Sequence, residues 1–129
     1  MTGPVAVTGA TGLLGRAVLR ARPGLGAVRA LVRDGSSAPD GVEVVRGHLL
    51  DRDALAKLVQ GCSGVLHLAA AMGSSPAEEM HDINVNGTRR LLEAAEAAGV
   101  PRFVFTSSVA ARRPEQGPYS QSKALAEER

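Results

Sequence analysis

Val5-Ala-Val-Thr-Gly-Ala-Thr-Gly-Leu-Leu-Gly15, near the start of the chain, is the stretch that decides the fold. Its β-branched residues predict a short strand over Val5–Thr8, and the apolar residues that follow predict a helix from Leu13 to about Arg22. Three glycines join the two elements, namely Gly9, Gly12 and Gly15. A strand, a glycine turn and a helix in this order indicate a cradle for a phosphate group.

Each glycine has a separate physical role in such a cradle. Gly9 permits the tight turn, Gly12 lets the backbone approach an anion, and Gly15 lets the helix pack closely on the strand. The free N–H groups and the positive dipole end of the helix then favour a pyrophosphate. The other interpretation is a turn that merely needs a positive φ, but the strand and helix around it favour a dinucleotide. The same turn places Thr11, Leu13 and Leu14 among the predicted cofactor contacts.

The composition predicts one compact α/β domain. The chain has 129 residues, of which 44% are hydrophobic and only 2% aromatic, so its core must consist of Val, Leu, Ala and Ile. Such residues suit a parallel sheet covered by alanine-rich helices. The net charge is only +2, and no basic block is interleaved with aromatic residues. We therefore expect no nucleic-acid partner.

A single cysteine, Cys62, excludes an internal disulfide and fits a reducing compartment. The sequence contains no signal peptide and no apolar run of membrane-spanning length. We expect a cytoplasmic protein that does not contact a membrane, and we predict no metal site.

Strand and helix patterns alternate along the whole chain. After the first unit we predict strands at Val28–Val32, Val42–Val45, Val65–Ala70 and Arg102–Ser107. Helices are predicted from Asp51 or Asp53 through Val59, from Pro76 to Met80 and on towards Val85, over Thr88–Ala98, and from about Tyr119. The alternation implies right-handed crossovers and a doubly wound parallel sheet of about five strands in one domain, residues 1–129.

The spacing Thr8-Gly9-x-x-Gly12-x-x-Gly15 resembles that of the short-chain dehydrogenase/reductase superfamily. The string Thr-Gly-Ala-Thr-Gly-x-x-Gly resembles its extended, epimerase/dehydratase-type branch. The resemblance covers Val5 through Arg129 and implies a Rossmann fold that binds NAD or NADP.

Arg33 lies at the end of the second predicted strand, where an arginine suits the 2′-phosphate of NADP and an acid would suit a ribose hydroxyl. Because Leu-Val-Arg-Asp also occurs there in family members, the resemblance implies NADP, with NAD as the alternative cofactor. A solvated surface arginine is the other interpretation. His48, followed by Leu49, departs from the family's Gly-Asp-Leu-x-Asp, so an imidazole that could stack or hydrogen-bond stands where a carboxylate would contact the adenine. We predict His48 and Leu49 as cofactor contacts.

The fourth predicted strand ends in His67-Leu-Ala-Ala70, which resembles the segment that walls the ribose side of the cofactor. We therefore predict that Leu68, Ala69 and Ala70 line the cofactor, whereas His67 is interpreted as a structural residue and not as a base. Further on, Asn84 lies in a match to the family's Asn-Val-x-Gly-Thr. The resemblance implies that Asn84 organises the helix and a water near the active site; the alternative is a helix break at Gly87.

Tyr119 and Lys123 carry the predicted chemistry, together with Ser108 after the fifth strand. Positions i and i+4 share one face of a helix. A free phenol has a pKa of about 10, and a cation beside it favours the phenolate. Lys123 would supply that cation and also bind the nicotinamide ribose, while Ser108 would hold the substrate carbonyl or hydroxyl.

The resulting hypothesis is an NAD(P)-dependent oxidoreductase with Tyr119 as general acid/base. The short connection between Ser108 and Tyr119 favours a reductase of small carbonyls or sterol-like alcohols over a nucleotide-sugar epimerase or dehydratase. A non-catalytic dinucleotide-binding module or redox sensor is the alternative. Since family members continue well beyond the position of Arg129, we expect the C-terminal substrate lobe to be absent. We then expect no turnover by the chain alone, and a homo-oligomer or self-association through an exposed sheet edge.

Overall fold

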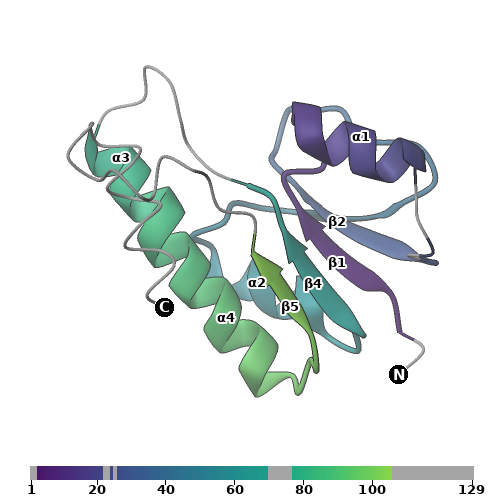
Figure 1. Ribbon diagram of the computed structural model, residues 1–129. Coiled ribbons are helices and arrows are strands. Elements are labelled where there is room, and N and C mark those ends of the chain that lie inside the picture. The colour runs from purple at the N-terminus through teal and green to yellow at the C-terminus, as the bar shows by residue number, and fades with distance from the viewer. Residues whose placement is uncertain (1–2, 22–23, 25, 70–76, 106–129) are drawn as a thin grey trace.

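Within the residues that the structure describes, five parallel strands form one sheet in the order β3-β2-β1-β4-β5 (Figure 1). This computed structural model describes residues 3–21, 24, 26–69 and 77–105. The strands are β1 (Val5–Thr8), β2 (Val28–Val32), β3 (Glu43–Arg46), β4 (Gly64–His67) and β5 (Phe103–Phe105). The predicted doubly wound parallel sheet is confirmed, with β1 at its centre.

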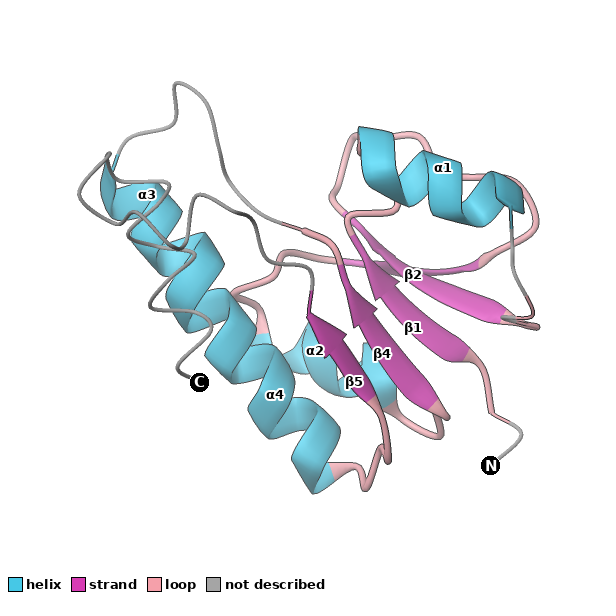
Figure 2. Ribbon diagram, in the orientation of Figure 1, coloured by secondary structure: helices cyan, strands magenta, loops and turns pink. Residues whose placement is uncertain are grey.

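Helices cover both faces of this sheet (Figure 2). They are α1 (Leu13–Ala21), α2 (Arg52–Val59), α3 (Ala77–His81), the π-helical turn η1 (Asp82–Gly87) and α4 (Thr88–Ala97). Alternate residues of β1 point to opposite faces. Ala6 therefore lies in the core with α2 and α4, whereas Val7 packs in a second core with Leu19 of α1.

Helix α2 is held at both ends by side chains of known role. Asp51 is its N-cap, because its carboxylate accepts hydrogen bonds from the N–H groups of Asp53 at 3.0 Å and Ala54 at 3.3 Å. Of the two predicted caps, Asp51 is thus the one in use. At the other end, Arg29 of β2 donates to the carbonyl of Gln60 at 2.6 Å and to Glu43 of β3 at 2.7 Å. One guanidinium therefore ties α2 to two strands.

Two predicted strands are shifted from their expected bounds, and β5 begins at Phe103 instead of Arg102. Strand β3 covers residues 43–46 instead of 42–45, and β4 ends at His67 although the sequence predicted a strand up to Ala70. The early end of β4 has a local cause. The Leu68 N–H is shared between the carbonyl and the hydroxyl of Thr8 at 3.1 Å, and the Ala69 N–H donates to the same hydroxyl at 3.1 Å, so a side chain takes over from the strand ladder.

One of the two interpretations of this segment, a helix break at Gly87, is wrong. Gly87 has helical torsions, φ −62° and ψ −44°, and the chain is helical from Ala77 to Ala97. The predicted last helix, from about Tyr119, lies outside the described residues.

Candidate cofactor-binding site

The glycine turn packs directly against two neighbouring elements. Gly9 has a φ of 77°, and a Cβ on it would lie 2.7 Å from the backbone nitrogen of Ala69. A Cβ on Gly15 would collide with the carbonyl oxygen of Gly9 and lie 2.8 Å from the Cα of Ala10. Both positions therefore exclude a side chain, which brings the turn, α1 and the end of β4 into backbone contact.

Gly12 has different surroundings. It is exposed, and a Cβ on it would meet only the Gly9 carbonyl at 3.4 Å. Its N–H donates to that carbonyl at 3.1 Å, and its own carbonyl accepts the N–H of Arg16 at 2.9 Å as α1 begins. The first turn of α1 is thus open to solvent, with the side chain of Leu13 89% and that of Leu14 48% exposed. An anion can approach this backbone without displacing protein atoms.

The structure brings most of the described residues predicted to bind the cofactor to the edge of the sheet formed by the carboxyl ends of the strands. The glycine turn follows β1, and the neighbouring strands in the sheet end next to it. Arg33 follows β2, His48 comes soon after β3, and Leu68 and Ala69 follow β4. In open α/β sheets ligands bind in the crevice at the carboxyl ends of the strands.

Leu49 does not share this exposure. Its side chain is only 5% exposed and belongs to the core with α2 and α4. A Cβ on Gly87 would lie 2.7 Å from a methyl carbon of Leu49. The side chain of Leu49 is therefore part of the core, and its role as a cofactor contact stays a prediction.

Arg33 and His48 are both exposed at this edge. The carbonyl of Arg33 accepts the N–H of Ser36 at 3.1 Å and the guanidinium of Arg46 at 3.2 Å, which fixes the backbone at that point. The Nδ1 atom of His48 accepts the N–H of Leu50 at 3.1 Å. With Nδ1 in use as an acceptor, a neutral ring carries its proton on Nε2.

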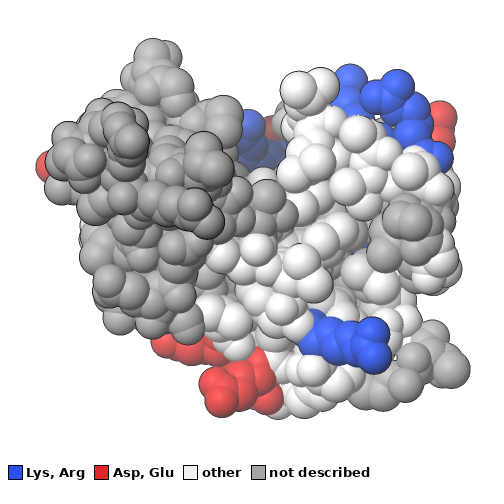
Figure 3. All heavy atoms as spheres, in the orientation of Figure 1, with Lys and Arg blue, Asp and Glu red and all other residues white. Residues whose placement is uncertain are grey.

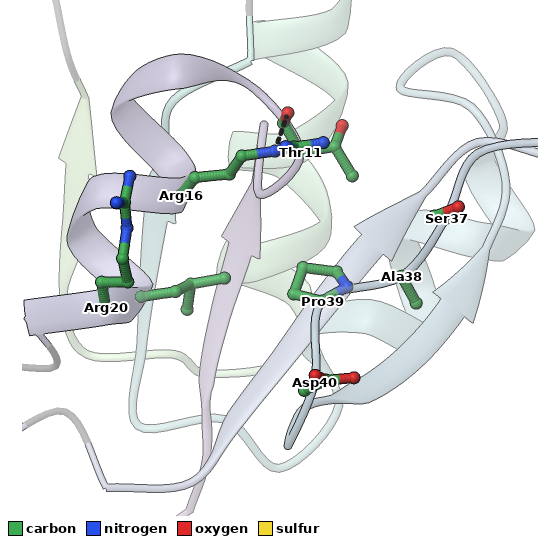
Figure 4. A pocket seen from close by; sticks show the side chains of 8 residues that line it. Thr11, Arg16, Arg20, Ser37, Ala38, Pro39 and Asp40 are labelled. Carbon is green, nitrogen blue, oxygen red and sulfur yellow. Dashed lines mark hydrogen bonds between the residues drawn. The ribbon is translucent and has the colours of Figure 1, made fainter.

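A cavity that the sequence did not predict lies beside the glycine turn. It has a volume of about 560 Å³ and lies between α1 and the loop after β2 (Figure 4). Arg16 bonds the Thr11 carbonyl through Nε at 2.9 Å, and both residues line the cavity. On the face of the molecule drawn in Figure 3, basic side chains lie at the end where α1 is found. The remaining lining residues are Leu19, Arg20, Ser37, Ala38, Pro39 and Asp40.

Beneath the site, three buried side chains form a connected chain of hydrogen bonds. The Thr8 hydroxyl lies 2.6 Å from Nδ1 of His67, and Nε2 of His67 lies 2.9 Å from the hydroxyl of Thr88. His67 is 1% exposed and packs against the rings of Phe103 and Phe105. Its interpretation as a structural residue agrees with this burial. The two threonine partners were not identified from the sequence.

Several predicted site residues fall elsewhere. Asn84 lies in η1 and is 2% exposed. Four others lie outside the described residues, namely Ala70, Ser108, Tyr119 and Lys123. Cys62 is buried, and its burial raises the pKa of the thiol, which favours the neutral form.

Within the described ranges, no group of histidine, cysteine and carboxylate side chains has the arrangement of a metal site. Nor is any of the helices described here long and apolar enough to cross a membrane.

Residues 5–128 match the model of a protein family described as the NAD dependent epimerase/dehydratase family. The chain belongs to this family. The expected resemblance to the short-chain dehydrogenase/reductase superfamily and the predicted Rossmann-type α/β fold are thereby confirmed.

Two curated members of the wider group are similar to this chain in sequence. One is a ceramide reductase of Caulobacter vibrioides, 40% identical over 136 residues, which cover 98% of this chain and 41% of the relative. The other is a putative dihydroflavonol 4-reductase of Synechocystis, 43% identical over 113 residues, which cover 81% of this chain and 32% of the relative. The chain thus spans well under half the length of either relative.

A solved structure of a family relative has the same fold. It is a short-chain dehydrogenase/reductase superfamily protein from Agrobacterium tumefaciens with bound NAD, 40% identical, with a TM-score of 0.84. The match covers 96% of this chain and 43% of that one.

Proposed function

We propose that this protein is an NADP-dependent reductase of the epimerase/dehydratase family that acts on a small carbonyl compound or a sterol-like alcohol. The observation that carries the proposal is the close-packed glycine turn, with Gly9 against β4, Gly15 against Gly9 and an open backbone at Gly12. Only a backbone without side chains leaves room for a pyrophosphate at this point. The relatives named as reductases support the reaction class.

The preference for NADP rests on cations around the adenosine end of the site. The guanidinium of Arg33 is exposed after β2 and has no hydrogen-bond or ion-pair partner within the part of the chain described here. Arg16 and Arg20 line the neighbouring cavity. A 2′-phosphate would gain charge-assisted hydrogen bonds from such groups, whereas a 2′-hydroxyl would not. The NAD in the Agrobacterium relative makes NAD the alternative.

Bound cofactor supplies a hydride, and the remaining steps fall to side chains of this chain. Ser108 would hold the substrate oxygen, and Tyr119 would donate a proton to it as the carbonyl is reduced. Lys123, four positions after Tyr119, would stabilise the phenolate that remains. Asn84 would contribute from η1, a π-helical turn, and such turns occur frequently at functional sites.

Two further parts of the proposal concern the surroundings of the enzyme. The single buried Cys62 fits a reducing compartment, which supports a cytoplasmic location. The partner expected is a small-molecule substrate.

Substitution of Tyr119 tests the proposal. In the protein expressed from its complete reading frame, Tyr119→Phe should lower the rate of carbonyl-dependent NADPH oxidation by about 10²–10⁴-fold, because general acid catalysis contributes that much. The dissociation constant for NADPH should stay the same, since the phenol does not hold the adenosine end. The measurement is NADPH consumption with a panel of ketones and aldehydes. Tight NADPH binding without turnover of any substrate would instead support a non-catalytic dinucleotide-binding module.

A further inference from the structure

The buried chain formed by Thr8, His67 and Thr88 joins three elements that are distant in sequence. Thr8 ends β1, His67 ends β4 and Thr88 begins α4. The exposed fractions of the three residues are 0%, 1% and 1%. In such a dry environment each polar atom needs a partner, so the direction of every hydrogen bond can be worked out.

The bonds at Thr8 determine the state of Nδ1. The Thr8 hydroxyl oxygen accepts hydrogen bonds at 3.1 Å from the N–H groups of Leu68 and Ala69, and the Leu68 N–H is shared with the Thr8 carbonyl, also at 3.1 Å. A hydroxyl oxygen has two lone pairs, and both are then in use. The contact of 2.6 Å with His67 must therefore be a bond that the hydroxyl donates to Nδ1. It follows that Nδ1 carries no proton.

The bonds at Thr88 lead independently to the same tautomer. The Thr88 hydroxyl lies 2.7 Å from the carbonyl of Asn84, which can only accept, so the hydroxyl proton is used there. The oxygen of Thr88 must then accept from His67, and Nε2 is the donor at 2.9 Å. His67 is thus a neutral imidazole protonated at Nε2. In this series of hydrogen bonds the Thr8 hydroxyl donates to His67, His67 donates to Thr88, and Thr88 donates to the Asn84 carbonyl.

Each end of this chain holds a part of the cofactor site described above. Through its hydroxyl, Thr8 holds the N–H groups of Leu68 and Ala69, and the Ala69 backbone lies against Gly9. Thr88 holds the carbonyl of Asn84 within η1. A hydroxyl that bonds the carbonyl four residues earlier competes with the helical hydrogen bonds, which fits the π-helical turn at this position.

We infer that His67 is a positioning residue that orders both ends of this site at once. Through Thr8 it fixes Leu68 and Ala69, which follow β4, against the glycine turn. Through Thr88 it fixes the turn of helix that carries Asn84. The inference rests on the proposed function only in taking this region as a cofactor site. The hydrogen bonds themselves are independent of any bound molecule.

Amide hydrogen exchange of the full-length protein tests the two ends separately. We expect Thr8→Val to accelerate exchange at Ala69 by at least about tenfold, because a lost hydrogen bond of about 1.4 kcal/mol changes an opening equilibrium by that factor. Thr88→Val should act in the same way on residues 84–89 and leave Ala69 unchanged. His67→Phe, which keeps a ring in the core, should accelerate both segments. The amide of Ala30 in β2 reports global unfolding and serves as the internal reference.

Matched controls keep the hydroxyls. Thr8→Ser and Thr88→Ser lose only a methyl group and should stay within about twofold of the parent at both segments. A His67→Phe variant whose exchange rises equally at Ala30 and at both segments would show general destabilisation and overturn the inference. Should His67→Phe fail to fold, ¹⁵N NMR of the parent remains decisive, since an imidazole protonated at Nδ1 would contradict the derived direction of the bonds.

NADPH affinity gives the functional readout. We expect His67→Phe to raise the NADPH dissociation constant about tenfold, the change that 1.4 kcal/mol produces, with Thr8→Ser near the parent value. Unchanged NADPH affinity in His67→Phe would refute the role in the cofactor site. None of these measurements needs turnover, so a protein that binds NADPH and reduces nothing would fail the proposed function while leaving this inference standing.

Discussion

Arg33 is the single residue on which the proposed cofactor preference depends most. We expect the protein to bind NADPH more tightly than NADH, and Arg33→Ala to remove most of the difference. A hydrogen bond to a charged group contributes about 1.5–3 kcal/mol, which corresponds to about a ten- to a hundredfold change in affinity. Titration of the parent and variant with both cofactors measures the effect.

Arg102→Ala is the matched control for this prediction. Arg102 is also exposed but precedes β5, at the opposite end of the strands from the glycine turn. Its loss changes the net charge by the same amount and should leave both affinities unchanged. Equal affinities of the parent for the two cofactors would contradict the prediction.

At the scale of residues, the sequence predicted best what depends on neighbours along the chain. Gly9 and Arg33 could be placed because each directly follows a recognisable strand. The burial of the Leu49 side chain could not be predicted, because it depends on α2 and α4, which pack over it from later in the chain. The bond between Thr8 and His67 joins residues 59 positions apart, so no local pattern indicates it.

Among the elements, α1 depends on a close approach to the glycine turn. Gly15→Ala should destabilise the fold by about 1–3 kcal/mol, because the added Cβ collides with the Gly9 carbonyl and forces backbone to shift. The gain in helix propensity from glycine to alanine is about 1 kcal/mol and offsets only part of this cost. Urea unfolding followed by circular dichroism measures the change.

Gly12→Ala provides the comparison. Its Cβ would lie 3.4 Å from the Gly9 carbonyl and meet nothing else, so the free energy of unfolding should hardly change. A loss of stability in Gly12→Ala as large as in Gly15→Ala would show that collision is not the cause.

The helix from Ala77 to Ala97 shows where element prediction reached its limit. Glycine is a poor helix former, and Gly87 therefore suggested a break. In the structure Gly87 is buried against Leu49, where a larger residue would not fit, and tertiary packing keeps the helix continuous. In the π-helical turn the hydroxyl of Thr88 bonds the Asn84 carbonyl, and that contact has no signature in hydrophobic periodicity.

For the molecule as a whole, the two edges of the described sheet differ in character. On the outer strand β3, Glu43 and Arg46 are exposed charged residues, and charges of this kind protect an edge from pairing with another chain. On β5, the apolar side chain of Val104 is 54% exposed. Self-association, if it uses a sheet edge, should therefore involve β5.

Val104→Lys should reduce any concentration-dependent self-association of the 129-residue chain, because a lysine on an edge strand opposes pairing. Sedimentation velocity over a range of concentrations measures the distribution of species. Ala98→Lys, at an exposed position after α4, adds the same charge away from the sheet and should leave the distribution as it is. Equal effects of the two substitutions would point to net charge and not to the β5 edge.

The central place of β1 also determines how the site comes into existence as the chain folds. Strand β1 pairs with β2 on one side and with the later strand β4 on the other. The first pairing closes a short segment, whereas the second must also bring Thr8 to His67 across 59 positions, at a greater entropic cost. The glycine turn therefore contacts Leu68 and Ala69, which follow β4, only once this long-range pairing has formed. In a nascent chain in which β4 has not yet been synthesised, only the glycine-turn half of the site can be present.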